Sequence, residues 1–252
     1  MQNSFVSNIP PVTKNLIIIN FIVFLAANVL STRGIIDLNS TFGLYFWQSD
    51  KFNPVQLLTY MFLHASIGHI FFNMFALLMF GVVIERFFGS RRFLIYYLVC
   101  GLGAGIVQEV VWYFDYASLI QNISYQNFLM VKQEGYHILQ QNQNYADQYL
   151  GNLNFLLHNP TIGASGAVFG ILLAFGWFFP NQKIYLYFLI PLKARVFVIL
   201  YGILELFYGV ANFKGDNVAH FAHLGGVLFG LLLILLWKKK MKNTDIDNYN
   251  NY

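Results

Sequence analysis

The sequence predicts an all-α integral membrane protein, built as a bundle of six transmembrane helices with its N- and C-termini in the cytoplasm. Of its 252 residues, 57% are hydrophobic and only 10% are Asp, Glu, Lys or Arg, whereas an ordinary soluble domain carries about 25% charged residues. The mean hydropathy is +0.53, and six apolar runs have the length that a membrane helix needs, about 17–25 residues. This composition excludes a disordered chain, a coiled coil and a nucleic-acid scaffold, and it argues against a soluble enzyme.

The six runs define a single membrane domain at residues 1–240, and a short polar cytoplasmic tail follows at 241–252. The first run is not expected to be a cleavable signal peptide, because Asn20 and Asn28 interrupt its apolar core. The third run contains Cys100, the only cysteine, which we expect to be a small buried side chain. The predicted spans are residues 14–32, 68–88, 93–114, 163–180, 194–211 and 218–237.

The positions of the basic residues predict which end of each span faces the cytoplasm, because cytoplasmic loops are enriched in Lys and Arg. One set of span ends carries eleven of these residues, namely Lys14, Arg86, Arg91, Arg92, Lys183, Lys193, Arg195, Lys238, Lys239, Lys240 and Lys242. The opposite set carries four, namely Arg33, Lys51, Lys132 and Lys214. The split alternates correctly for six spans, so the net charge of +4 reflects membrane topology rather than a nucleic-acid partner.

Two of the segments predicted to lie outside are long. Residues 33–67 mix aromatic and polar residues, which indicates an amphipathic segment lying partly in the membrane interface. Residues 115–160 form an Asn/Gln-rich loop insertion, because 14 of the 39 residues from Gln121 to Asn159 are Asn or Gln. Such stretches tend to be weakly ordered, although the interspersed Phe, Leu, Ile and Tyr residues allow a short surface helix.

Strongly polar side chains inside a span are costly and are functional candidates by default. His69 and Asn73 are four residues apart in the second span, so they share one helix face. Ser165 opens the apolar run of the fourth span within the sequence GASG, and His220 and His223 open the sixth. Under the predicted orientation, all of these residues lie in the outer part of the bilayer.

Small residues predict which of these spans are in contact. Stripes of small residues at four-residue spacing let helix backbones approach closely in lipid. They occur in the fourth span as Gly166, Gly170 and Ala174, and in the sixth as Ala222, Gly226 and Gly230. His223 points along the second stripe, so pairing the two stripes brings Ser165 beside His223.

This combination of residue types is suited to acyl transfer. A serine hydroxyl needs an adjacent base to become a nucleophile, and a neutral imidazole can be that base. Hydrogen-bond donors must also stabilise the oxyanion. His69 and Asn73 offer side-chain donors, and the Ser165 N–H lies at a helix N-terminus. The residues therefore predict an acyl-transfer site open to outside water.

Structural roles remain open for each of these residues. A serine in a span often bonds the carbonyl four residues before it, small-residue stripes are often packing alone, and Asn73 can link helices. We expect Glu109 and Glu205 to be hydrogen-bonded structural acids or interface anchors rather than catalysts, with His64 and His220 supporting the site. The four histidines of these segments are candidate zinc ligands, but no Asp, Glu or Cys lies in the same motifs, so we predict no metal.

At these residues the sequence resembles the rhomboid family of intramembrane serine proteases. TYMFLHASIGHIFFNMFAL contains the H-x-x-x-N pattern as His69 and Asn73, ERFFGSRRFLIYY follows the second span, and GASGAVFG carries the G-x-S-G motif with Ser165. AHLGGVLFG carries the family histidine as His223. The resemblance covers roughly residues 14–237 and fits the bacterial six-span core. The sequence departs from the family in its long Asn/Gln-rich loop and in Trp47-Gln48, where many members have Trp-Arg.

The resemblance implies a Ser165–His223 dyad without a third carboxylate. It also implies an oxyanion hole formed by His69, Asn73 and the Ser165 amide, which we expect Gly163 and Gly166 to support. The implied activity is cleavage of single-span membrane proteins near the outer leaflet of the lipid bilayer, in the bacterial cytoplasmic membrane. The alternatives are a catalytically silent rhomboid-like protein that binds membrane clients and a small six-span transporter, which would usually show inverted repeats. No cofactor and no nucleic-acid partner are indicated, and nothing indicates the oligomeric state.

Overall fold

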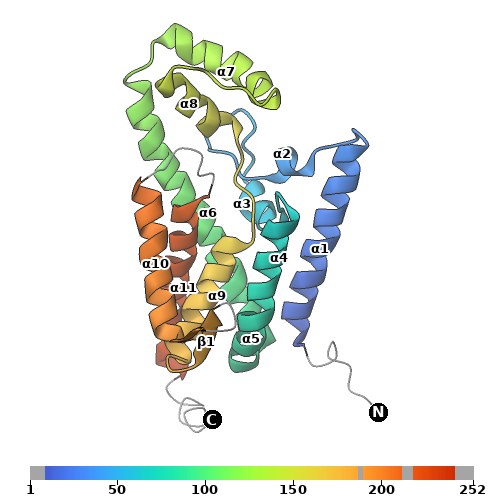
Figure 1. Cartoon of the computed structure of the whole chain (residues 1–252), viewed down its shortest axis with the longest axis vertical. Helices are drawn as coiled ribbons and strands as arrows, with labels where there is room; N and C mark the ends of the chain where they lie inside the picture. Colours follow the sequence, from blue (N-terminus) through green and yellow to red (C-terminus); the bar gives the residue numbers. More distant parts are fainter. Residues whose placement is uncertain (1–8, 187–189, 212–217, 242–252) are drawn as a thin grey trace. The chain divides into compact units, whose positions relative to one another are not determined.

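The computed structural model describes residues 9–186, 190–211 and 218–241, and Figure 1 labels their helices and strands. Among these residues, five helical segments are long and apolar enough to cross a membrane, and α9 (Ser165–Phe178) is a shorter apolar helix of 14 residues. The predicted all-α membrane class is therefore confirmed. The long segments are α1 (Pro11–Thr32), α4 (Ile67–Ala76) continued through a π-helical turn (Leu77–Gly81) into α5 (Val82–Phe88), α6 (Ser90–Ile120), α10 (Ala194–Ala211) and α11 (His220–Met241).

Smaller elements connect the long helices. The segment after α1 contains α2 (Leu38–Phe42), α3 (Gln56–Thr59) and a 3₁₀ turn (Tyr60–Phe62), and the segment after α6 contains α7 (Tyr125–Gln140) and α8 (Gln148–His158). Two strands, β1 (Lys183–Leu186) and β2 (Ile190–Lys193), pair antiparallel between α9 and α10. The sequence did not predict this hairpin. The predicted tail at 242–252 lies outside the described residues.

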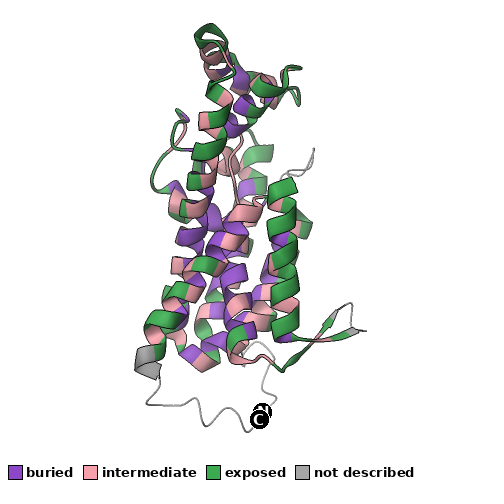
Figure 2. Ribbon diagram, turned by 90° about the vertical axis from the view of Figure 1, so that its left-hand side faces the viewer, coloured by how far each residue is buried: buried purple, intermediate pink, exposed green. Residues whose placement is uncertain are grey.

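The chain divides into two compact units, which we describe separately. Unit 1 comprises the described residues within 1–17, 73–104 and 165–252, and unit 2 comprises residues 18–72 and 105–164. In unit 1, α9 is buried along most of its length. The Phe80 ring packs against Phe175 with the ring centroids 5.0 Å apart, and the Tyr96 hydroxyl donates to the Gly170 carbonyl at 2.8 Å. By contrast, α10 exposes apolar side chains such as Ile203, as expected for a helix that faces lipid (Figure 2).

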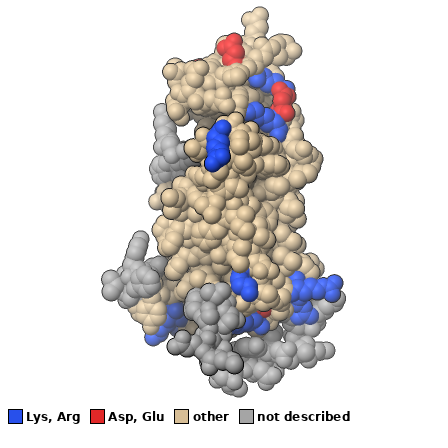
Figure 3. Space-filling view, turned by 90° about the vertical axis from the view of Figure 1, so that its right-hand side faces the viewer, with Lys and Arg blue, Asp and Glu red and all other residues tan. Residues whose placement is uncertain are grey.

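The basic side chains of unit 1 gather at one end of that unit (Figure 3). They lie where α1, α6 and α10 begin, where α5 and α11 end, and in the β hairpin. They are Lys14, Arg86, Arg91, Arg92, Lys183, Lys193, Arg195 and Lys238. Ser165 begins α9 and His223 lies in the first turn of α11, so both are at the opposite ends of their helices from this basic end.

Glu85 anchors the start of α1 within unit 1. Its carboxylate accepts hydrogen bonds from the N–H groups of Val12 and Thr13, at 2.9 and 2.7 Å, and from the Ser90 hydroxyl at 2.7 Å. The first N–H groups of a helix have no partner within the helix, and Glu85 supplies acceptors for two of them. The side chain is 1% exposed, so this capping is inside the protein.

We predict that Glu85→Ala lowers the free energy of unfolding by about 1–3 kcal/mol, because the two α1 amides and the Ser90 hydroxyl lose their acceptor inside the protein. Thermal unfolding of detergent-solubilised protein measures the change. Glu134→Ala is the matched control, since Glu134 is exposed on α7. Equal unfolding temperatures for the two variants would contradict the capping role of Glu85.

The Asn/Gln-rich insertion differs from the expected weakly ordered loop, because in unit 2 it folds as the helix pair α7 and α8. Ser124 and Asp147 cap the two helices by accepting from Asn127 N–H and Leu150 N–H. Amide side chains bond to one another, since Asn154 Nδ2 donates to Asn144 Oδ1 at 2.9 Å. The helices enclose an apolar cluster made of Phe46, Val131, Leu153, Leu156 and Leu157. Buried apolar residues and paired amides thus order a stretch whose composition alone indicated a loop.

Candidate active site

A glycine-dependent turn precedes the candidate nucleophile. Gly163 has a φ of +140°, which favours glycine over residues with a side chain. Its N–H donates to the Tyr60 carbonyl at 2.9 Å, and this bond fixes the turn within unit 2. The next helix, α9, starts at Ser165. The Ser165 N–H therefore belongs to the first turn, whose amides have no partner within the helix.

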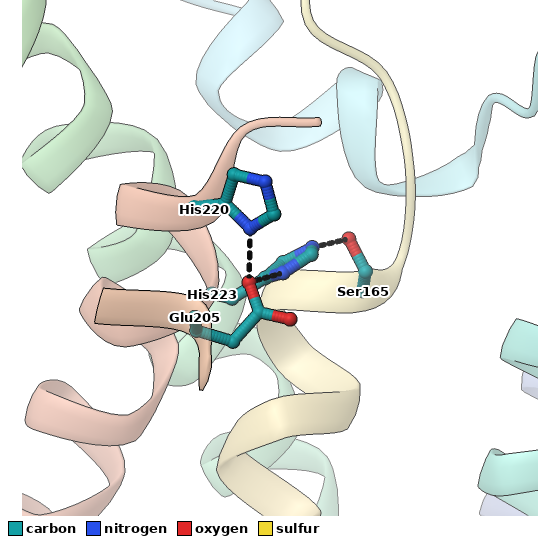
Figure 4. Close-up of polar contacts among 4 residues, drawn as sticks. All are labelled: Ser165, Glu205, His220 and His223. Atoms are coloured by element: carbon teal, nitrogen blue, oxygen red, sulfur yellow. Dashed lines mark hydrogen bonds and ion pairs between the residues drawn. The ribbon is translucent and has the colours of Figure 1, made fainter. Parts of the chain in front are cut away.

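Ser165 and His223 are in direct contact within unit 1. The Ser165 Oγ lies 2.8 Å from the His223 Nε2 (Figure 4). The His223 ring stacks on Phe169, one turn after Ser165 on α9, with the ring centroids 4.3 Å apart and an interplanar angle of 8°. His223 is 8% exposed. One face of the imidazole is thus held by an aromatic ring while its Nε2 is directed at the hydroxyl.

Glycines allow the backbones of α9 and α11 to approach closely. A side chain at Gly226 would overlap the Gly166 carbonyl, and a Cβ at Gly170 would lie 3.2 Å from the Gly226 carbonyl oxygen. Gly170 and Gly230 also lie close to α6, because a Cβ at Gly170 would overlap the Cys100 sulfur and one at Gly230 would lie 2.5 Å from the Tyr96 hydroxyl. The two small-residue stripes therefore face each other in unit 1, and this contact brings the N-terminal ends of α9 and α11 together.

Glu205 extends the polar contacts beyond His223. Its Oε2 accepts hydrogen bonds from the Nδ1 of His223 at 2.8 Å and from the Nδ1 of His220 at 2.6 Å (Figure 4). Glu205 is 5% exposed and comes from the second half of α10. From the sequence we expected Glu205 to be a structural acid or an interface anchor. Its contact with the histidines was not predicted, because the relative register of α10 and α11 cannot be inferred from spacing within either helix.

Glu205, His220 and His223 also form a group that could hold a metal ion, since one ligand atom from each lies within 4.8 Å of the others. No acid lies in the sequence motif of these histidines, but the fold brings Glu205 of α10 beside them. The donor spacing nevertheless matches hydrogen bonds. Ligands of a tetrahedral zinc ion at about 2.0–2.1 Å from the metal lie about 3.3 Å apart, whereas the two Nδ1 atoms lie 2.6 and 2.8 Å from Oε2.

The other residues singled out from the sequence lie on α4, on α6 and in the segment just before α4. Asn73 is 5% exposed in unit 1 and is four residues after His69 on α4. In unit 2, the His69 Nδ1 accepts from the Ala65 N–H at 3.4 Å, and the His69 ring lies 4.9 Å from the His64 ring, centroid to centroid. Glu109 Oε2 accepts from the Trp47 N–H at 3.0 Å, which links α6 to the segment after α1.

The buried position of His64 predicts that acid destabilises unit 2. Burial lowers the pKa of His64 to about 3, and the neighbouring His69 acts in the same direction. An unfolded histidine has a pKa of about 6.5, so between these values the unfolded chain binds a proton that the folded chain does not. Stability is therefore lost as the pH falls from about 6.5 towards 3, by at most about 1.4 kcal/mol per pH unit.

We predict that His64→Phe, which keeps a buried aromatic ring, reduces the drop in unfolding temperature between pH 7 and pH 4.5. Part of the drop should remain, because burial also lowers the pKa of His158 on α8. Thermal unfolding at the two pH values measures the difference, with His137→Phe on α7 as the control. An unchanged drop in His64→Phe would show that His64 does not contribute.

Comparison with known proteins identifies the family. Residues 51–240 match the Rhomboid domain family. The chain is 31% identical over 173 residues to RHOMBOID-like protein 12, mitochondrial, of Arabidopsis thaliana, an alignment that covers 68% of this chain and 42% of that protein. It is 28% identical over 176 residues to Rhomboid protease GluP of Bacillus subtilis, covering 69% of this chain and 24% of GluP.

A yeast relative extends the comparison. Rhomboid protein 1, mitochondrial, of Saccharomyces cerevisiae is 23% identical over 180 residues, covering 71% of this chain and 41% of that protein. The chain thus spans less than half the length of each of these three relatives. The Rhomboid match nevertheless extends over most of the chain, from before α4 to the last turn of α11. This multi-pass membrane protein belongs to the rhomboid family.

Proposed function

We propose that the chain is an intramembrane serine endopeptidase that cleaves single-span membrane proteins near the outer leaflet. The observation that carries this proposal is the 2.8 Å contact between the Ser165 Oγ and the His223 Nε2. A serine becomes a nucleophile when a positioned base takes its proton, and this distance lies within the range for that transfer. Retention of both residues argues against a catalytically silent client-binding protein.

The proposed reaction proceeds through an acyl-enzyme. His223 Nε2 accepts the Ser165 hydroxyl proton as Oγ attacks the scissile carbonyl carbon. The resulting tetrahedral intermediate collapses, the C–N bond breaks, and His223 returns the proton to the leaving amine. Water, deprotonated by His223, then attacks the acyl carbon. The bond from this carbon to the Ser165 Oγ breaks, and His223 returns the proton to Oγ. The substrate must be locally unwound, and extended backbone is tolerated at membrane depth only in a protein-lined or wet cavity.

The oxyanion requires donors that are fixed before the reaction. We propose the Ser165 N–H together with the side chains of His69 and Asn73. The Ser165 N–H is supported by its place in the first turn of α9, where the helix dipole favours negative charge. Gly163 supports the site through its positive φ, and Gly166 through its close approach to α11.

We propose that both termini are cytoplasmic and that the site opens to the outside of a bacterial cytoplasmic membrane. The concentration of Lys and Arg at one end of unit 1 supports this orientation under the positive-inside rule. The comparisons include a bacterial protein and two whose names place them in mitochondria. The partners proposed for this chain are single-span membrane proteins and the lipid bilayer.

Labelling with a fluorophosphonate probe tests the proposal, because this reagent reacts with an activated serine hydroxyl. Purified protein should be labelled, and it should cleave a single-span reporter in liposomes. Ser165→Ala and His223→Ala should lose both activities, while Ser31→Ala, at an exposed position on α1, should keep them. Equal labelling in all four proteins would contradict the protease proposal. A wild-type protein that binds the reporter but neither reacts nor cleaves would indicate the silent binder.

A further inference from the structure

We infer that Glu205 is a positioning residue for His223, so that the site works as a Ser165–His223–Glu205 triad rather than as a dyad. This inference deepens the proposed function and rests on it. The three side chains come from α9, α11 and α10, respectively, and all lie in unit 1. They form an unbroken series of contacts from a hydroxyl through an imidazole to a carboxylate (Figure 4).

The geometry fixes which ring nitrogen of His223 carries the proton. An ionised carboxylate only accepts hydrogen bonds, so the 2.8 Å contact requires His223 Nδ1 to carry the hydrogen and donate it to Glu205 Oε2. In a neutral imidazole the other nitrogen then has a free lone pair. That nitrogen is Nε2, which lies 2.8 Å from the Ser165 Oγ. Glu205 thereby selects the tautomer that can take the serine proton.

The carboxylate also acts once the proton has moved. When Oγ attacks, its proton passes to Nε2 and the His223 ring becomes an imidazolium. Glu205 keeps its negative charge and takes no proton, so it stabilises the imidazolium through the Nδ1–H bond. In a site of low dielectric this attraction is stronger than in water. Glu205 is 5% exposed and His223 is 8% exposed, so both partners are shielded from water.

The environment of the carboxylate is suited to holding it in place. The same Oε2 accepts from His220 Nδ1 at 2.6 Å, and the His220 ring is nearly parallel to Tyr208, with centroids 5.6 Å apart. Two bonds therefore restrain one oxygen. A role limited to joining α10 to α11 would need only the bond to His220. The second bond is made to Nδ1 of His223, whose other ring nitrogen, Nε2, faces Ser165.

Steady-state kinetics of Glu205→Gln in liposomes test the inference. We expect kcat to fall by about 10²–10⁴-fold, the usual scale of general-base catalysis, while KM stays within threefold and the unfolding temperature is retained. A lower kcat at an unchanged unfolding temperature would indicate a positioning role. A purely structural role would instead lower the unfolding temperature and leave the kcat of the remaining folded protein unchanged. Glu109→Gln is the matched control, since Glu109 is also buried but contacts Trp47.

The outcomes separate this inference from the proposed function. If the wild type cleaves in a Ser165-dependent manner and Glu205→Gln keeps kcat within threefold, the triad is wrong and the protease proposal stands. If the wild type neither cleaves nor reacts with the fluorophosphonate, both are overturned. If Glu205→Gln does not fold, Glu205→Asp is measured in its place. This variant keeps the negative charge, but its side chain is one methylene shorter, so the carboxylate lies farther from His223. We expect a 10- to 100-fold lower kcat at unchanged KM. A kcat within threefold of the wild type would overturn the triad.

Discussion

Gly226→Val should abolish proteolysis, with a loss of at least about 100-fold in kcat/KM, because the new side chain cannot fit between α9 and α11. A Cβ at this position already overlaps the Gly166 carbonyl, and that atom belongs to backbone that cannot rotate away. The helices must separate at the end where Ser165 and His223 meet. A shift of 1 Å at a catalytic contact can cost about 100-fold in rate.

The measurement combines reporter cleavage with fluorophosphonate labelling of folded, purified protein. Gly202→Val is the matched control, because a Cβ at Gly202 on α10 meets no atom within 4 Å. The control should keep most of the wild-type activity, since its new side chain has open space. Normal cleavage by Gly226→Val would show that the approach of α9 and α11 does not set the distance between serine and histidine.

Asn73→Ala should lower kcat by about 10²–10³-fold, the cost measured when one oxyanion donor is removed from a serine protease. KM should stay within threefold, because the donor is needed only once negative charge develops on the carbonyl oxygen. Asn73 is 5% exposed on α4 in unit 1, so truncation to alanine leaves a small space without adding volume.

The control for this prediction is Asn28→Ala. Asn28 lies on α1, and its Nδ2 donates to the Phe24 carbonyl of the same helix at 2.7 Å. Steady-state kinetics of the two variants, alongside thermal unfolding, separate a catalytic loss from a folding defect. A kcat of Asn73→Ala within threefold of the wild type would remove Asn73 from the oxyanion hole.

The long helices could be predicted from the sequence because each depends on the hydropathy of its own residues. The predicted span at 194–211 coincides with α10, and the span at 218–237 lies within two residues of the start of α11. Glycine spacing also indicated which helix faces meet, since a close approach leaves no room for side chains. Hydropathy and small-residue periodicity are properties of one helix at a time, so they can be read without knowing the rest of the fold.

Contacts between different segments were harder to predict from the sequence. Glu205 reaches His223 only because α10 and α11 have one particular register, and no pattern within α10 specifies it. The helix pair α7 and α8 was not predicted, because a high content of Asn and Gln is typical of a loop. Composition does not show that Asn144 and Asn154 bond to each other. In both cases the missing information is the identity of the hydrogen-bond partner.

The length of α9 links the chemistry to the lipid. A 14-residue helix rises about 21 Å at 1.5 Å per residue, whereas the hydrocarbon core of a bilayer is about 30 Å thick. If the C-terminal end of α9 lies at one face of that core, Ser165 at its start would lie inside the hydrocarbon, unless the surrounding bilayer is thinner there. Such hydrophobic mismatch costs fractions of a kcal/mol per Å. For the proposed protease, the acyl-chain length of the surrounding lipids would then influence which peptide bond of a substrate helix meets the serine.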